Sequence, residues 1–208
     1  MTLGGFFMQW QSLSHINQPV VLGSGSPRRH SLFKYIFNQF EVISTDAELE
    51  QCSGDAADFV LRNAKYKAER ILSENKKSLN QGTLFTFDTV VSVENRLLGK
   101  PSSIQDARKM LQTLCGRSHQ VSTAYCVFKI DEHVELLSGS VSTTVNFIRY
   151  DTEHLEAYLA TGESLDKAGA YGIQGFGRLL VKDIDGCYYN VVGLPLTALF
   201  YDLKGLNL

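Results

Sequence analysis

Apolar side chains change their spacing along the chain, from short continuous runs to positions three or four residues apart. Continuous runs rich in β-branched and aromatic residues predict strands. These runs cover residues 19–25, 40–45, 83–93, 119–130 and 135–149. Apolar positions at the 3.6-residue period predict helices over 28–38, 58–72, 102–114, 151–162 and 195–206. Because strands and helices are mixed along the chain, the pattern indicates an α/β protein with a mixed sheet.

Turn residues show how some of these elements connect. Glu94 and Asn95 predict a tight turn, and the charged residues 131–133 predict a long hairpin between the strands on either side. Residues 183–194 resemble a further hairpin. Residues 162–181 are rich in glycine and are predicted to form a long loop.

The length of 208 residues suits one domain, or two tightly joined lobes, with a sizeable core. We expect a single domain over residues 20–208, preceded by an N-terminal extension at 1–19. This extension has neither the basic start nor the long apolar stretch of a signal peptide. No apolar run reaches about 18 residues, so no membrane partner is expected.

Charge and sulfur content narrow the function classes. The net charge of -2 provides no basic field for nucleic acid. The four cysteines form no C-x-x-C pair, which disfavours a disulfide framework or zinc site and indicates a reducing, cytoplasmic location. The five histidines are scattered, so a histidine-held metal is not expected. An oxygen-ligated cation such as Mg2+ would need only carboxylates and a substrate phosphate.

Arg28 and Arg29 follow a Gly/Ser loop that contains Ser24 and Ser26. Such a loop lets backbone N–H groups approach an anion, and the following helix start adds partial positive charge. Arginine in a first helical turn opposes the helix dipole, which suggests an external anion such as phosphate. The alternative is a solvated basic pair beside an ordinary turn.

Three further charged residues lie in apolar surroundings. Lys67 shares the apolar stripe of its helix, so its ammonium either extends to solvent or points into a cleft. Asp88 interrupts a buried strand, where an unpaired carboxylate is costly. Lys100 follows the Glu94-Asn95 turn and should return near Asp88, unless it is only a turn lysine.

The glycine-rich segment 162–175 also carries charged and amide side chains, namely Asp166, Lys167 and Gln174. Glycines permit close backbone approach to a ligand, and an amide can read the edge of a nucleobase. An elaborate structural loop is the alternative. Together with the basic residues and buried carboxylate above, the segment suits a polyphosphate substrate bound with a divalent cation.

Five motifs resemble the Maf family of nucleoside triphosphate pyrophosphatases. They are "LGSGSPRR", "FDTVV…LLGKP", "LCGRSHQVSTA", "GESLDKAGAYGIQG" and "YYNVVGLPL", in the family order. The resemblance implies a single catalytic domain with an inosine triphosphatase-like α/β fold, in which a twisted mixed sheet with flanking helices forms two lobes around a cleft. It also implies hydrolysis of a nucleoside triphosphate to its monophosphate and pyrophosphate, with Mg2+ or Mn2+. The "DKAGAYGIQG" form looks like the branch that prefers dTTP and UTP.

The resemblance further implies individual roles. The expected substrate-binding residues are Ser24, Arg28, Arg29, Lys67, Lys167 and Gln174. The expected catalytic residues are Asp88, Glu48 and Lys100, of which Asp88 and Glu48 would hold the cation. Which carboxylate acts as the base stays open.

Two departures from the family pattern bear on the cleft. Thr86-Phe87 replaces a usual Gly-Ala pair, so Phe87 is expected to narrow the cleft and disfavour purines. Ungapped comparison places Leu49 where the family has an acidic residue; either Glu48 or Glu50 supplies it, and we favour Glu48.

The predicted function is therefore metal-dependent hydrolysis of dTTP and UTP. The alternative is a nucleotide-binding regulator of cell division without significant turnover. The oligomeric state, a homodimer included, stays open, as does the choice between nucleotide-pool sanitation and division control as the biological role.

Overall fold

A computed structural model describes residues 13–50 and 54–206 of the chain. Seven strands form one sheet in the order β2-β1-β3-β5-β6-β7, with β4 paired to the far end of the same β3 edge that β1 uses. The strands are β1 (Val20–Gly23), β2 (Glu41–Val42), β3 (Thr83–Val93), β4 (Arg96–Leu98), β5 (Ser118–Lys129), β6 (Val134–Phe147) and β7 (Val181–Asp185). β1 pairs in parallel with β2 and β3, and the remaining pairs are antiparallel, so the predicted mixed sheet is confirmed.

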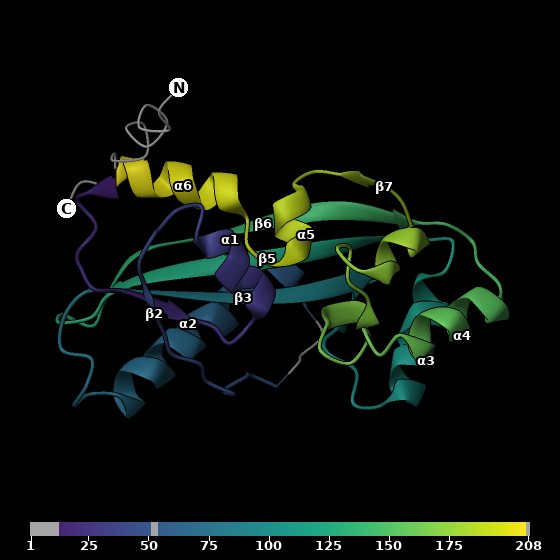
Figure 1. Cartoon of the computed structure of the whole chain (residues 1–208), viewed down its shortest axis with the longest axis horizontal. Coiled ribbons are helices and arrows are strands. Elements are labelled where there is room, and N and C mark those ends of the chain that lie inside the picture. The colour runs from purple at the N-terminus through teal and green to yellow at the C-terminus, as the bar shows by residue number, and fades with distance from the viewer. Residues whose placement is uncertain (1–12, 51–53, 207–208) are drawn as a thin grey trace, which may run out of the picture.

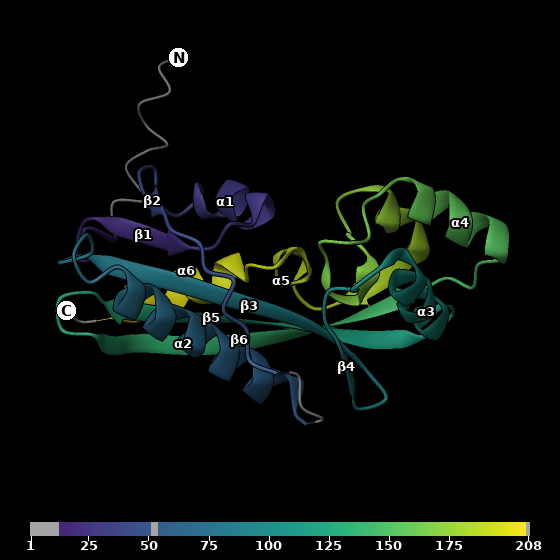
Figure 2. The ribbon, with the colours of Figure 1, turned by 90° about the horizontal axis from the view of Figure 1, so that it is seen from below.

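The helices gather in two groups along the length of the sheet (Figure 1). They are α1 (Pro27–Phe33), α2 (Ala56–Glu74), α3 (Ile104–Leu114), α4 (Thr152–Ala160), α5 (Tyr188–Val192) and α6 (Leu196–Gly205), with short 3-10 turns η4 (Ala168–Ala170) and η5 (Phe176–Leu180). One lobe contains α1, α2 and α6, and the other contains α3 and α4 (Figures 1 and 2). The long strands β3, β5 and β6 run through both lobes.

Side-chain caps define where the main helices begin. Ser26 accepts a hydrogen bond from the backbone N–H of Arg29, and Pro27 occupies the first turn of α1. Asp55, Ser103 and Asp151 cap α2, α3 and α4 in the same way. These short polar side chains satisfy N–H groups that lack a partner within the helix.

Alternation along the strands divides the core between the two faces of the sheet. Phe85 and Phe87 of β3 point to the face covered by α1 and α6, where they join one buried cluster. Leu84 and Val90 point to the opposite face and pack under α2. A further cluster joins β3, β5 and β6 to α3 and α4 in the second lobe. This two-residue alternation is the ordinary consequence of strand geometry.

The edge of β3 is open between its two partners on that side. β1 pairs with β3 only as far as Thr86, and β4 pairs with it only from Val91 onward. Residues 87–90 of β3 therefore lie between the end of β1 and the start of β4. Because successive side chains point to opposite faces, Asp88 and Thr89 reach this gap from the two faces of the sheet.

One prediction of local structure is wrong. Residues 183–194 do not form a hairpin: β7 ends at Asp185, and α5 follows. Asn190 secures α5 by donating from Nδ2 to the backbone oxygen of Val121 and to Thr143 Oγ1, at 2.8 and 2.9 Å. Gly193 ends this helix with a φ of 112°, a conformation that glycine adopts without strain.

The described part of the N-terminal extension is packed against the core. Leu13 and Ile16 are buried, and His15 Nε2 lies 2.9 Å from the backbone oxygen of Leu203 in α6. Residues 1–12 lie outside the described residues.

Candidate active site

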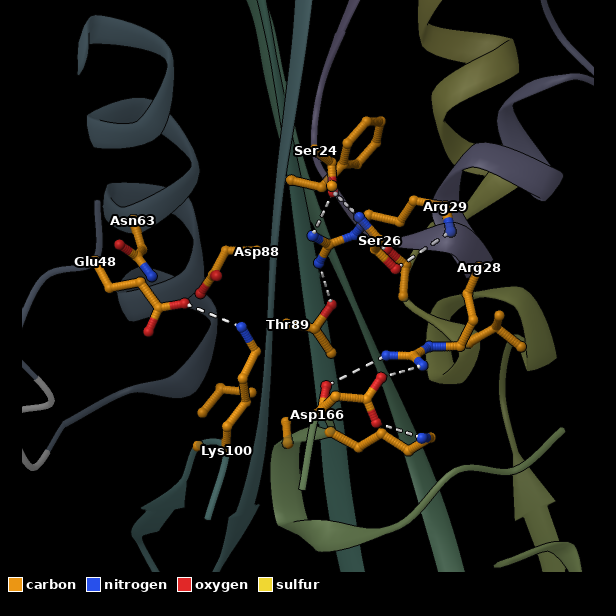
Figure 3. A pocket seen from close by; sticks show the side chains of 18 of the residues that line it. Ser24, Ser26, Arg28, Arg29, Glu48, Asn63, Asp88, Thr89, Lys100 and Asp166 are labelled. Atoms are coloured by element: carbon orange, nitrogen blue, oxygen red, sulfur yellow. Dashed lines mark hydrogen bonds and ion pairs between the residues drawn. The ribbon is translucent and has the colours of Figure 1, made fainter. Parts of the chain in front are cut away.

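A cleft of about 720 Å³ lies at the open edge of β3, between the two lobes. Its walls come from the loop after β1, the start of α1, the 44–49 segment, α2, and the glycine-rich segment before η5. All of the site residues predicted from the sequence line this cleft: Ser24, Arg28, Arg29, Glu48, Lys67, Asp88, Lys100, Lys167 and Gln174. Figure 3 shows how many of these side chains converge from the different walls.

Lys67 and Asp88 form a buried ion pair at the floor of the cleft. Lys67 Nζ lies 2.5 Å from Asp88 Oδ1, and about one tenth of each side chain is exposed. Of the two alternatives for Lys67, the ammonium points into the cleft rather than out to solvent. The pair also explains how an otherwise apolar strand accommodates a carboxylate, since each charge neutralises the other.

Glu48 faces the same ammonium from the 44–49 segment. Its Oε1 lies 3.6 Å from Lys67 Nζ and 3.6 Å from Lys100 Nζ, so it links the buried lysine to the more exposed one. The next residue, Leu49, packs against the α2 cluster and donates its backbone N–H to Asn63 Oδ1 at 3.0 Å. Glu50 is not among the described residues that line the cleft.

Arg29 is a partly buried residue that the protein itself holds in place. Its Nε donates to the backbone oxygen of Gly193 at 2.8 Å, and its two terminal nitrogens donate to Ser24 and Thr89 at 3.3 and 2.9 Å. Burial lowers the pKa of Arg29 to about 10, opposed by nearby Asp88, so it stays charged at neutral pH. The guanidinium also lies 5.8 Å from the ring centroid of Phe87. A solvated arginine is therefore excluded here.

Arg28 is paired across the cleft. Its Nη1 donates to Asp166 Oδ2 at 2.9 Å, and its Nη2 donates to the Asp166 backbone oxygen at 3.4 Å. Lys167 Nζ donates to the other carboxylate oxygen of Asp166 at 2.5 Å and to the backbone oxygen of Glu163 at 2.6 Å. The basic pair of the sequence thus separates into Arg29, which hydrogen bonds fix within its own wall, and Arg28, which reaches the opposite wall.

Phe87 and Gln174 differ in what they present to the cleft. The Phe87 ring lines the cleft, is fully buried against Phe33 and lies beneath the Arg29 guanidinium. Its narrowing of the cleft stays a prediction. Gln174 lines the cleft and is exposed, while its backbone oxygen accepts a hydrogen bond from Arg178. Its side-chain amide is therefore placed where a ligand can reach it.

Asn63 and Tyr171 are among the contributors to the site that were not predicted. Asn63 lies one helical turn before Lys67 on α2, is 2% exposed, and lines the cleft, so its spacing from Lys67 was a usable signal. Tyr171 lines the cleft and hydrogen-bonds His119 Nε2 at 2.8 Å. Burial lowers the pKa of His119 to about 4. Only the fold brings His119 and Tyr171 together.

The residues of this cleft suit a divalent cation shared with a substrate. The carboxylates of Asp88 and Glu48 face one common positive group, Lys67 Nζ, at 2.5 and 3.6 Å. Among the described residues, no group of three or more histidine, cysteine, aspartate or glutamate side chains is arranged to hold a metal ion by itself. Magnesium in nucleotide enzymes uses one or two carboxylates, with phosphate oxygens and water completing its shell, and this donor set fits that pattern.

Comparison with known proteins places the chain among relatives of similar length. The family described as Maf-like protein matches residues 19–206. The chain is 44% identical over 181 residues to a Thermococcus gammatolerans protein named dTTP/UTP pyrophosphatase, covering 87% of this chain and 93% of that protein. It is 40% identical over 190 residues to a Ruminiclostridium cellulolyticum protein of the same name, covering 90% and 96%.

A solved structure resembles the fold. The Staphylococcus aureus Ham1 protein superposes with a TM-score of 0.50 at 18% identity, covering 90% of this chain and 99% of that one. This agrees with the two-lobed α/β fold that the motifs implied. In the part of the chain that the structure describes, no helix is long and apolar enough to cross a membrane.

Proposed function

The chain belongs to the Maf-like protein family, and on that premise we propose that it hydrolyses dTTP and UTP to the nucleoside monophosphate and pyrophosphate. The observation that carries the proposal is the convergence of Asp88, Glu48, Lys67 and Lys100 on one wall of a cleft whose other wall presents Arg28. The names of the relatives in Thermococcus gammatolerans and Ruminiclostridium cellulolyticum support the substrate assignment.

The basic residues bind and orient the triphosphate. Arg28 and Lys100 are the more accessible cations, with 27% and 61% of their side chains exposed, and they contact phosphate oxygens from opposite sides. Arg29 has N–H groups beyond its three protein bonds, so it holds the Ser24 loop in shape and still contributes positive charge. Most of the rate enhancement comes from this positioning and charge stabilisation.

Asp88 and Glu48 are the carboxylates that would bind the divalent cation. Asp88 and Glu48 would hold a divalent cation such as Mg2+ or Mn2+ together with phosphate oxygens, and a bound cation supplies charge neutralisation and polarisation of the phosphoryl group. Lys67, which lies between the two carboxylates in this structure, keeps them oriented and neutralised.

Water attacks the α-phosphorus, and the bond from that phosphorus to the bridging oxygen of the β-phosphate breaks. The proton of the attacking water passes to a carboxylate of the Asp88–Glu48 pair, and the basic side chains stabilise the charge that develops on the departing pyrophosphate. Water enters the two products as one hydroxyl and one proton, so the reaction balances without another reactant.

Gln174 reads the base. A pyrimidine such as uracil presents alternating carbonyl and N–H groups, and a side-chain amide provides both a donor and an acceptor to match them. The exposed position of Gln174 on the cleft wall supports this role.

Product analysis tests the proposal. Incubation of the purified full chain with dTTP, UTP and purine triphosphates in the presence of Mg2+ should release pyrophosphate and the pyrimidine monophosphate. A regulator without turnover would instead gain thermal stability with dTTP and release nothing, and release of orthophosphate would indicate cleavage at a different bond.

The free thiols of Cys115, Cys126 and Cys187 support a cytoplasmic setting for this activity.

A further inference from the structure

Asp166 holds one cation on each of its carboxylate oxygens. Arg28 Nη1 lies 2.9 Å from Oδ2, and Lys167 Nζ lies 2.5 Å from Oδ1. Partial burial opposes ionisation, but hydrogen bonds from Lys167 and Arg28 prevail and hold the pKa of Asp166 below its usual range. Asp166 is therefore a carboxylate anion that engages two of the basic groups lining the cleft.

The pair joins the two walls of the cleft. Arg28 comes from α1, whose first turn is fixed by Pro27 and the Ser26 cap. Asp166 comes from the loop between α4 and η4, and Figure 3 shows its carboxylate pointing across the cleft toward Arg28. The side chain of Asp166 is 60% exposed, whereas that of Arg28 is 27% exposed. Of the two partners, Asp166 is the one that can turn toward water.

An anionic substrate would meet this carboxylate in its own binding cleft. The Asp166 oxygens occupy the direction in which the Arg28 fork donates, with Nη1 bonded to Oδ2 and Nη2 to the backbone oxygen. We propose that Asp166 is an internal counter-anion, which a polyphosphate must displace from Arg28 in order to bind. The inference rests on the proposed function for its ligand class, a nucleoside triphosphate or another linear polyphosphate.

The exchange is energetically accessible. A partly exposed ion pair contributes little net stability, so Asp166 is readily exchanged. A phosphate group offers the same guanidinium a bidentate, charge-assisted contact and brings more negative charge than one carboxylate. Until the exchange, Asp166 keeps Arg28 and Lys167 ordered. If Asp166 instead stayed in place and oriented Arg28 toward the substrate, a neutral variant at this position would bind polyphosphate more weakly.

The variant Asp166→Asn tests this directly, because asparagine keeps the shape and removes the charge. Titration calorimetry with inorganic tripolyphosphate, without divalent cation and at fixed ionic strength, should show binding at least about fivefold tighter than in the unaltered protein, which corresponds to about 1 kcal/mol. In an Arg28→Gln background the same substitution should give a clearly smaller gain in affinity, because only Lys167 is then freed from Asp166.

Asp46→Asn is the matched control. Asp46 lines the same cleft and forms no ion pair with a described residue, so neutralising it should change tripolyphosphate affinity less than about twofold. Equal or weaker binding by Asp166→Asn, or an equal gain in both arginine backgrounds, would overturn the proposal. Thermal melting of each variant without ligand checks folding, and the arginine-background comparison still decides if Asp166→Asn is somewhat less stable.

Pyrophosphate release from dTTP is measured on the same preparations. If dTTP is hydrolysed but Asp166→Asn does not bind tripolyphosphate more tightly, the counter-anion role fails and the proposed function stands. If no preparation hydrolyses dTTP, the proposed function fails, and the tripolyphosphate titrations still decide whether Asp166 competes for Arg28.

Discussion

Lys67 Nζ donates to Asp88 Oδ1 across 2.5 Å, in a site where each side chain is about nine-tenths buried. Such a pair is asymmetric in its energetics. Its formation contributes little net stability, but removal of either partner leaves a buried charge that is poorly compensated. Glu48, whose Oε1 lies 3.6 Å from Lys67, provides some compensation when Asp88 is altered.

Asp88→Asn should therefore fold but lose activity. The asparagine oxygen can still accept from Lys67, so the secondary structure measured by circular dichroism should be unchanged. Loss of the carboxylate should lower kcat for dTTP by at least about two orders of magnitude, the range typical of a missing acid–base group. Asp46→Asn, a change of the same kind in the same cleft, should stay within about threefold. Near-normal turnover by folded Asp88→Asn would remove this residue from the catalytic set.

The two adjacent arginines should differ in their effect on stability. Arg29→Ala removes a partly buried charge and its three hydrogen bonds, so we expect a loss of about 2–4 kcal/mol in the free energy of unfolding measured with urea. Arg28→Ala breaks a partly exposed pair and should cost less than about 1 kcal/mol. Equal costs, or a larger cost for Arg28, would contradict the structural role given to Arg29.

Gln174→Ala should reduce discrimination between bases. The unaltered protein should hydrolyse dTTP and UTP at least about tenfold more efficiently than dATP or dGTP, a difference of about 1.4 kcal/mol in transition-state binding. The ratio of kcat/KM values should shrink in Gln174→Ala. Leu165→Ala alters the same wall and should leave that ratio within about twofold. An unchanged ratio in Gln174→Ala would exclude the amide as the base reader.

Stability should fall in mild acid because of His119. Burial lowers its pKa in the folded protein to about 4, against an ordinary value of 6.5, so the unfolded chain binds a proton more readily. The contribution is fully present above pH 6.5 and is lost as the pH falls toward 4. It amounts to roughly 3 kcal/mol, since one pKa unit corresponds to about 1.36 kcal/mol.

Urea unfolding of the unaltered protein and of His119→Gln, at pH 7.5 and pH 5, measures this contribution. Tyr171 OH and the rings of Phe147 and Tyr171 face the imidazole, and neither tyrosine nor phenylalanine changes charge in this range. His119→Gln should show a smaller loss between the two pH values. An identical loss would assign the acid sensitivity to other groups.

A site residue could be predicted when the sequence next to it marks it as unusual, and not when its role depends on a distant partner. Lys67 could be placed because its helix has a regular apolar stripe, and Asp88 because a carboxylate is conspicuous in an apolar strand. The different roles of Arg28 and Arg29 could not be separated, because Gly193 and Asp166 lie far away in the sequence. Local patterns identify a charged residue but not the partner that the fold supplies.

The fold itself was predictable where a pattern extended over many residues. The long strands β3, β5 and β6 and the helix α2 all lie where their periodicity placed them. The error at residues 183–194 arose in a short segment, where the five-residue helix α5 depends on Asn190 bonds to β5 and β6. Such tertiary bonds override the weak preferences of a few residues.

The continuity of the sheet has a mechanical consequence. β3, β5 and β6 contain 11, 12 and 14 residues, and the β3–β5 ladder is unbroken from Thr83 to Ser92. At about 3.3 Å per residue, these strands form a continuous section of sheet roughly 40 Å long that both lobes share. A hinge-like opening of the two lobes would bend these shared strands and strain the hydrogen bonds between them. The sheet therefore sets the spacing of the two walls, and we expect adjustment to an incoming nucleotide in the loop segments 44–49 and 161–167.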